Sequence, residues 1–500
     1  MPRPSSFAQV EIETGEETER LQIPEPDSPF HIAVFGDFSG RENRGMLDAK
    51  LQGRKPFLID RDNFDDVLAQ LAPELHLPLG GAEGPLVALR FHELDDFHPD
   101  RIFEGLKFFR VLRETREQLH DPAGYEAAAA LVRSWSGITR PQQAPQSTPA
   151  PDVSRLSARE LFEQTLSATE ARSGGASPAR ARDDFQALLR DIVAPYVEPK
   201  PDPQKPELVA QVDRAISGQM RALLHHPQFQ SLESAWRAMF FLIRRLSTDT
   251  NLKVYLFDIA KPEMAADMVA TYERLIEHTP REEPWALLAG IYTFEQTDDD
   301  VRLLGRMAAV AKSAGAPFLA AASPRILGCD SFGETPEPRR WHPADNDSWN
   351  ALRRLPQASW LGLALPRFLL RLPYGKATDS TETFAFEEFG SVPPRHEDYL
   401  WGNPAMACAY LLGEAFSESG WDFHPGEVGE ISGLPLYVHR ADGESHLKPC
   451  AEALLTEQAA ENILDHGLMP LLSIKGSDAI RLVRFQSIAE PPRALSGRWS

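Results

Sequence analysis

The sequence has few cysteines, and it lacks both a long apolar run and the pattern of a secretory signal peptide. Its 500 residues include three cysteines, Cys329, Cys408 and Cys450, whose wide separation gives neither a disulfide framework nor a paired-cysteine metal site. Free thiols of this kind are typical of a reducing compartment, so we expect a cytoplasmic protein. No run of about 18 apolar residues occurs, and we expect no membrane insertion. The N-terminus lacks the apolar segment of a signal peptide.

Basic residues are also fewer than acidic residues. The chain has 52 Lys and Arg against 73 Asp and Glu, which gives a net charge of −21. Because nucleic acids and anionic membranes are themselves negative, we expect neither as a general partner. The remaining composition, 42% hydrophobic and 25% charged, is that of a globular protein. The length allows about two or three domains.

A phosphate-binding or nucleophile motif is missing where one is most expected. The stretch HIAVFGDFSGRENR, residues 31–44, predicts a buried strand followed by a polar turn. Its glycines are too close for a Walker loop, no lysine follows them, and Ser39 lacks the flanking glycines of a nucleophile elbow. We therefore predict a structural turn, in which Asp37 and Ser39 satisfy backbone amides and Gly40 supplies an unusual φ after Gly36.

Metal ligands and acid–base pairs do not converge either. His225 and His226 are adjacent, so their side chains point apart on a helix. Residues 298–300 are three aspartates, which are commonplace in the first turn of a helix. Glu387 and Glu388 face opposite ways in an extended segment. We expect no catalytic residue, no bound metal and no cofactor.

Composition divides the chain into four parts. We expect a flexible N-terminal arm over 1–28, a small domain over 29–136, a linker with a short amphipathic helix over 137–182, and a larger domain over 183–500. The linker begins with a stretch rich in Pro, Gln and Ser that cannot bury a core. The predicted fold class is α/β, with a small α/β N-terminal domain linked to a larger α/β domain that contains βαβ units.

The first folded part shows clear local patterns. Residues 54–60 and 86–91 predict strands, and Asp62 or Asn63 is placed to cap a helix. A further helix is expected over 101–119. Its apolar stripe, which we expect to contact the second folded part, consists of Ile102, Leu106, Phe109 and Leu112.

The second folded part predicts a long helical segment over 219–246, interrupted at Pro227 because proline cannot continue a helix. Residues 285–322 predict a strand, a helix and a parallel strand. Two arginines of the sequence lie among apolar residues and need carboxylate or carbonyl partners, for which Glu387 or Glu388 is a candidate. The structural core residues we single out are Trp236, Arg367, Arg371 and Trp401.

Longer blocks of the sequence resemble a known family. PFHIAVFGDFSGR, RKPFLIDRDNFDDVLAQLAP and LDDFHPDRIFEGLKFFRVLRETREQL resemble the small subunit of the type VI secretion contractile sheath. HHPQFQSLESAWRAMFFLI, APFLAAASP, LGLALPRFLLRLPYG, FAFEEF, YLWGNPAMA and PCAEALLTE resemble the large subunit, in the same order. The resemblance implies a fusion of the two subunits, a structural turn after the first strand, no catalysis and no cofactor, and assembly in the bacterial cytoplasm around an inner tube.

The resemblance to the large subunit stops before the C-terminal domain that interlocks neighbouring sheath subunits. Three functions therefore remain open: a structural sheath component that acts by protein–protein assembly, a sheath-derived adaptor, terminator or regulator that does not polymerise, and an enzyme that uses residues 285–322. The implied partners are sheath, tube or baseplate proteins of the secretion apparatus. We expect a monomer or small oligomer when the protein is alone.

A final resemblance concerns the linker. ARELFEQTLSATEAR resembles the amphipathic segment of the large sheath subunit that the recycling ATPase recognises. Leu161, Phe162 and Leu166 would be the anchors that enter a groove of that ATPase. The alternative is a helix that docks on the body of its own protein.

Overall fold

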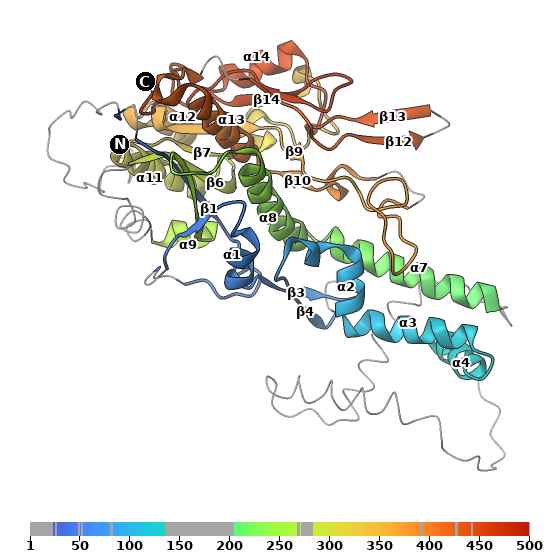
Figure 1. The fold of residues 1–500 in the computed structure, drawn as a ribbon. Helices are drawn as coiled ribbons and strands as arrows, with labels where there is room; N and C mark the ends of the chain where they lie inside the picture. The colour runs from blue at the N-terminus through green and yellow to red at the C-terminus, as the bar shows by residue number, and fades with distance from the viewer. Residues whose placement is uncertain are drawn as a thin grey trace, which may run out of the picture.

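A mixed sheet of nine strands forms the centre of the molecule (Figure 1). The computed structural model describes residues 24–25, 28–48, 51, 54–80, 84–135, 205–267, 271, 284–390, 394–425, 429–441 and 444–499. Across the sheet the strands follow the order β11 (Glu430–Ile431), β15 (Ile480–Leu482), β14 (Met469–Ser473), β8 (Leu361–Leu365), β7 (Phe318–Ala322), β6 (Trp285–Phe294), β1 (Phe30–Gly36), β5 (Leu252–Asp258) and β2 (Phe57–Ile59).

The middle of the sheet, from β14 to β5, is parallel. At the edges β2 is antiparallel to β5, β15 is antiparallel to β14, and β11 is antiparallel to β15. Helices α8 (Pro227–Arg245) and α13 (Pro404–Ser419) belong to the core on one face. Helices α11 (Asp298–Ala314), α12 (Asp347–Arg353) and α14 (Glu457–Asp465) belong to the core on the other. Two covered faces explain why the central strands are continuous apolar runs. The α/β class is thereby confirmed.

Strand β1 joins the two folded parts of the sequence. It lies between β5 and β6, with Val34 opposite Leu256 on one side and opposite Ala289 on the other. All seven residues of β1 are buried. We expected two linked domains that pack together, and the structure places a strand of the first part inside the sheet of the second. The physical reason is that a strand that is buried on both faces needs neighbours on both edges as well as helices above and below it.

The remaining short strands form three two-stranded sheets among the described residues. They are β3 (Glu74–Pro78) with β4 (Leu86–Arg90), β9 (Phe368–Leu369) with β10 (Trp401–Gly402), and β12 (Tyr437–Ala441) with β13 (Glu444–Lys448). Helices α1 (Phe64–Leu71) and α9 (Lys261–Ala266) lie near β1 in Figure 1. Within the described ranges, no helix has both the length and the apolar character needed to cross a membrane.

A helical arm projects from the body (Figure 1). It contains α3 (Lys107–His120), α4 (Tyr125–Trp135) and α7 (Lys205–Leu224), and α2 (Pro99–Gly105) lies at its base. The single helix expected over 101–119 is therefore two helices. Leu106, after the poor helix former Gly105, has an extended backbone with φ −87° and ψ 124°. The expected stripe is nevertheless buried, and α3 packs against α7 of the second part.

Local signals in the second part are confirmed. Helix α7 ends at Leu224 and α8 begins at Pro227, so the chain turns where proline predicts it. Strands β6 and β7 are parallel and are joined by α11, which Gly315 ends with φ +64°. The three cysteines are buried and free.

Candidate functional site

The turn after β1 is held by a carboxylate from the other part of the chain. Asp258 ends β5, and its Oδ1 accepts hydrogen bonds from the backbone amides of Phe38 at 2.9 Å and Ser39 at 3.1 Å. Its Oδ2 accepts from Ser39 Oγ at 2.7 Å and from Arg41 Nε at 3.0 Å. Successive backbone amides around an oxyanion are the arrangement with which glycine-rich turns bind phosphate. Here the oxyanion is the protein's own side chain.

The other residues that the sequence predicted for this turn also lie in the turn after β1. Asp37 accepts hydrogen bonds from the backbone amides of Arg41 at 2.8 Å and Glu42 at 3.0 Å. Burial raises the pKa of Asp37, and the nearby carboxylate of Asp258 raises it further. Gly40 has φ +73°, and a Cβ there would lie 2.5 Å from the carbonyl oxygen of Glu74. Gly36 is the last residue of β1. The sequence predicted that Asp37 and Ser39 satisfy backbone amides; Asp37 does so, whereas the Ser39 hydroxyl instead donates to Asp258, a residue that the sequence did not single out.

The crevice where α/β sheets usually bind ligands is filled by side chains. Strands β5 and β6 lie on opposite sides of β1, and ligands bind at the carboxyl ends of the strands where the order reverses. Phe38 and Trp236 are completely buried at this position, with ring centres 5.3 Å apart. Trp236 Nε1 also donates to the carbonyl oxygen of Phe38 at 2.9 Å. Side chains from the first and the second folded parts of the chain therefore pack together at this end of the sheet and fill it.

A buried ion-pair network surrounds Arg371. Its Nε donates to Glu233 Oε1 at 2.8 Å and its Nη1 donates to Glu388 Oε2 at 2.7 Å. Burial by itself would raise the pKa of Glu388, but Arg371 and His225 more than reverse that effect and lower it to about 2. The sequence suggested Glu388 as a partner. Glu233 gave no local signal because it lies 138 positions from Arg371.

Arg367 anchors a second network nearer the surface. Its backbone amide and its Nε donate to Glu452 at 2.9 Å and 2.8 Å, and 37% of its side chain is exposed. Burial would raise the pKa of Glu452, but Arg367 and His396 lower it to about 2. Trp401 is buried beside this network and donates from Nε1 to the carbonyl oxygen of His396 at 2.8 Å. Neither glutamate named from the sequence is a side-chain partner of Arg367 in the structure.

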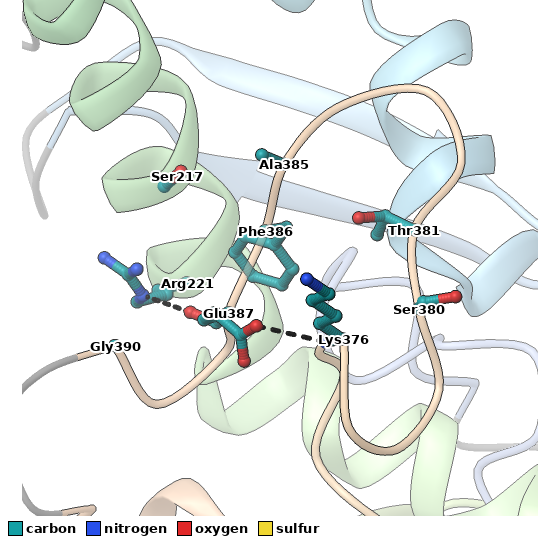
Figure 2. A pocket seen from close by; sticks show the side chains of 9 residues that line it. All are labelled: Ser217, Arg221, Lys376, Ser380, Thr381, Ala385, Phe386, Glu387 and Gly390. Atoms are coloured by element: carbon teal, nitrogen blue, oxygen red, sulfur yellow. Dashed lines mark hydrogen bonds between the residues drawn. The ribbon is translucent and has the colours of Figure 1, made fainter.

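Two pockets lie near these networks. The larger, about 910 Å³, is at the carboxyl ends of β6 and β7, and its two partly buried histidines are already paired, His225 with Glu388 and His396 with Glu452. The smaller, about 580 Å³, lies between α7 and the loop over 375–390 (Figure 2). Across the residues the structure describes, no group of three or more His, Cys, Asp or Glu is arranged to hold a metal ion.

Two other sequence predictions have different outcomes. The aspartates at 298–300 form the first turn of α11, where Asp300 pairs with Lys261 at 2.6 Å and Asp299 pairs with Arg302 at 2.6 Å. Leu161, Phe162 and Leu166 lie outside the described residues, as does the linker around them.

Comparison with known proteins places both parts of the chain in type VI secretion. Residues 206–489 match the VipB family, described as EvpB/VC_A0108, tail sheath N-terminal domain. Residues 8–131 match the family described as type VI secretion system, VipA, VC_A0107 or Hcp2. Because the first match covers more than half of the chain, the protein belongs to the type VI secretion tail sheath family VipB. The expected fusion of two sheath-subunit families is confirmed.

A curated relative agrees with this assignment. The chain is 33% identical over 305 residues to the type VI secretion system sheath protein TssC1 of Pseudomonas aeruginosa. The match covers 57% of this chain and 61% of the relative, so it spans less than two thirds of that protein.

Proposed function

We propose that this protein is a structural component of a bacterial type VI secretion sheath, in which one chain supplies both subunit types and acts by assembly with other sheath subunits. The observation that carries the proposal is the position of β1 between β5 and β6. It supports a single assembled unit, because the VipA-like segment contributes a central strand to the VipB-like sheet. The burial of Phe38 and Trp236 in the usual ligand crevice supports a role without catalysis, and the matches to type VI secretion sheath families support a cytoplasmic location.

Negative-stain microscopy of the purified chain, alone and with the sheath subunits of its own organism, tests this proposal. We expect the chain to enter sheath assemblies, and an Asp258→Ala variant, which removes the carboxylate that holds the turn after β1, to enter them less well. Absence of the chain from such assemblies would argue against the proposal. Particles that bind an end of the sheath without extending it would favour the adaptor or terminator role, and tube and baseplate proteins can be tested in the same way.

The recycling ATPase is a further candidate partner, supported by the apolar anchors Leu161, Phe162 and Leu166 in the sequence. A peptide of residues 155–172 should bind the cognate ATPase, and Leu161→Ala should abolish that binding. The enzyme alternative is tested by thermal unfolding with nucleotides and common metal ions, for which we expect no shift in the melting temperature.

A further inference from the structure

We propose that His439 and His446, which lie opposite each other in the β12–β13 hairpin, form a binding site for a divalent transition-metal ion such as Zn²⁺ or Cu²⁺. The hairpin projects from the body of the molecule (Figure 1). Its register pairs His439 of β12 directly with His446 of β13. Residues that are directly opposite in an antiparallel ladder have their side chains on the same face of the sheet. The inference is independent of the proposed assembly function.

The distance between the two imidazole rings suits one shared ion. The ring centres lie 5.6 Å apart. An imidazole nitrogen binds Zn²⁺ at about 2.0–2.1 Å, so the centres of two rings that share one ion lie about 5–6 Å apart. The ring planes are at 27° to each other. Because the ring torsion of histidine has a broad minimum, both rings can turn toward one ion without movement of the backbone.

Neither imidazole of the pair is bonded to another protein group. Among the residues that the structure describes, no side chain or backbone group forms a hydrogen bond or an ion pair with the ring of His439 or His446, and His439 Nδ1 is a buried nitrogen without a partner. The histidines of the larger pocket differ, because His225 and His396 each have a glutamate oxygen within 3.3 Å. A neutral ring whose acceptor nitrogen has no donor keeps that lone pair for a metal ion.

The body of the protein holds one of the two ligands in place. The ring of Tyr437, two positions before His439 on the same face of β12, stacks on the His439 ring with centres 5.9 Å apart and planes at 14°. Tyr437 in turn packs against Phe389, with ring centres 5.7 Å apart. The His439 ring is therefore ordered before an ion arrives, which reduces the entropic cost of binding. His446 supplies the second nitrogen from an exposed position.

The surroundings of the pair favour the uncharged imidazole. Burial lowers the pKa of His439, and the neighbouring His446 and Lys448 lower it further. The neutral form is the one that binds metal ions, because a protonated ring has no lone pair to donate. Lys448 is held by the body of the protein, since its Nζ donates to the carbonyl oxygen of Glu452 at 3.1 Å.

The two imidazoles select the class of ion. Imidazole nitrogens suit Zn²⁺, Cu²⁺ and Ni²⁺, whereas Mg²⁺ and Ca²⁺ prefer oxygen ligands. Zinc sites with a structural or catalytic role have three or four protein ligands, so an ion held by two histidines keeps water in its remaining positions and binds less tightly. The bound ion would connect β12 to β13, and a hairpin of only two strands is marginally stable by itself.

The first test measures Zn²⁺ binding to the full chain by equilibrium dialysis in an excess of Mg²⁺. We expect His446→Asn to weaken the binding by about tenfold or more. Because His446 is exposed, this variant should keep the melting temperature of the unmodified chain. His342→Asn removes an exposed histidine outside the hairpin and should leave Zn²⁺ binding unchanged. Equal Zn²⁺ affinities of the two variants would overturn the inference.

Two further measurements locate the ion. Electron paramagnetic resonance of bound Cu²⁺ should detect two imidazole nitrogens in the unmodified chain and one in His446→Asn; a single nitrogen in the unmodified chain would overturn the shared site. Hydrogen exchange of the β12 and β13 amides should slow when Zn²⁺ is added, and unchanged exchange at saturating Zn²⁺ would also overturn it. The melting temperature of the whole chain is not the readout, because a projecting hairpin opens before the central sheet unfolds.

Discussion

Ser39 Oγ donates a 2.7 Å hydrogen bond to Asp258, a residue 219 positions later in the sequence. The same carboxylate is bonded by two backbone amides and by Arg41. Asp258→Ala leaves these donors without an acceptor, and we expect a loss of about 3 kcal/mol in the free energy of unfolding, measured by urea denaturation. Asp299→Ala, which removes an exposed carboxylate, should cost less than about 1 kcal/mol. Equal losses would contradict the role given to Asp258.

Gly40 and Gly45 allow a steric effect to be separated from a conformational one. Both have positive φ, +73° and +63°, but a Cβ on Gly40 would meet the carbonyl oxygen of Glu74 whereas one on Gly45 would meet nothing within 4 Å. Gly45→Ala should cost about 1–2 kcal/mol from left-handed strain alone. Gly40→Ala should cost clearly more, because the backbone of β3 must also move. Similar melting temperatures for the two variants would show that the close approach is unimportant.

Acid should destabilise the protein through Glu388 and Glu452. Each has a pKa of about 2 in the folded chain against an ordinary value of 4.5. The unfolded chain therefore takes up these protons at higher pH than the folded chain does, so the stabilisation is complete above pH 4.5 and is lost as the pH falls toward 2. Each group contributes on the order of 3 kcal/mol.

Glu388→Gln tests this account. The variant should be less stable at neutral pH, because Arg371 loses a charged partner, and its stability should depend less on pH between 4.5 and 2. Glu461→Gln, at an exposed position, should behave as the unmodified chain does. The measurement is the melting temperature as a function of pH, and an unchanged slope in the Glu388 variant would exclude the ion pair as the cause.

Cleavage of the connection between the segments should not separate them. A specific protease site inserted between Pro149 and Ala150 allows the cut, and the two pieces should elute together on a sizing column. The reason is that β1 is paired with β5 and β6 along both edges. Denaturing urea should separate the pieces, and their separation without urea would show that the covalent connection holds the halves together.

Structural features that depend on a few neighbouring residues could be predicted from the sequence. Pro227 and Gly315 mark helix boundaries because one removes a backbone donor and the other adopts a left-handed φ. The N-cap position of α1 was also predictable at Asn63, although its side chain accepts from the amide of Asp60 instead of capping the helix. The extended backbone at Leu106 interrupts a helix whose apolar spacing predicts continuity.

Strand pairing and ion pairs between residues far apart in the sequence could not be predicted. The pattern of β1 predicts burial but carries no information about which strands lie beside it, because any apolar strand satisfies the same hydrogen bonds. The glutamates that pair with the arginines illustrate the same limit. Glu388 lies 17 residues from Arg371 and was a candidate, whereas Glu233 and Glu452 are distant from their partners and look like any other glutamate in the sequence.

During translation β1 leaves the ribosome long before its neighbours exist. Phe38 precedes Asp258 by 220 residues, and synthesis at 5–20 residues per second makes that interval about 11–44 s. During this time the seven residues of β1 lack the strands that later bury them, which favours association with other nascent chains or capture by a chaperone. In return, every ribosome that completes the chain delivers both segments in equal number. In a fused chain the two segments do not have to find each other as separate polypeptides, but the burial of β1 is delayed until its neighbouring strands have been synthesised.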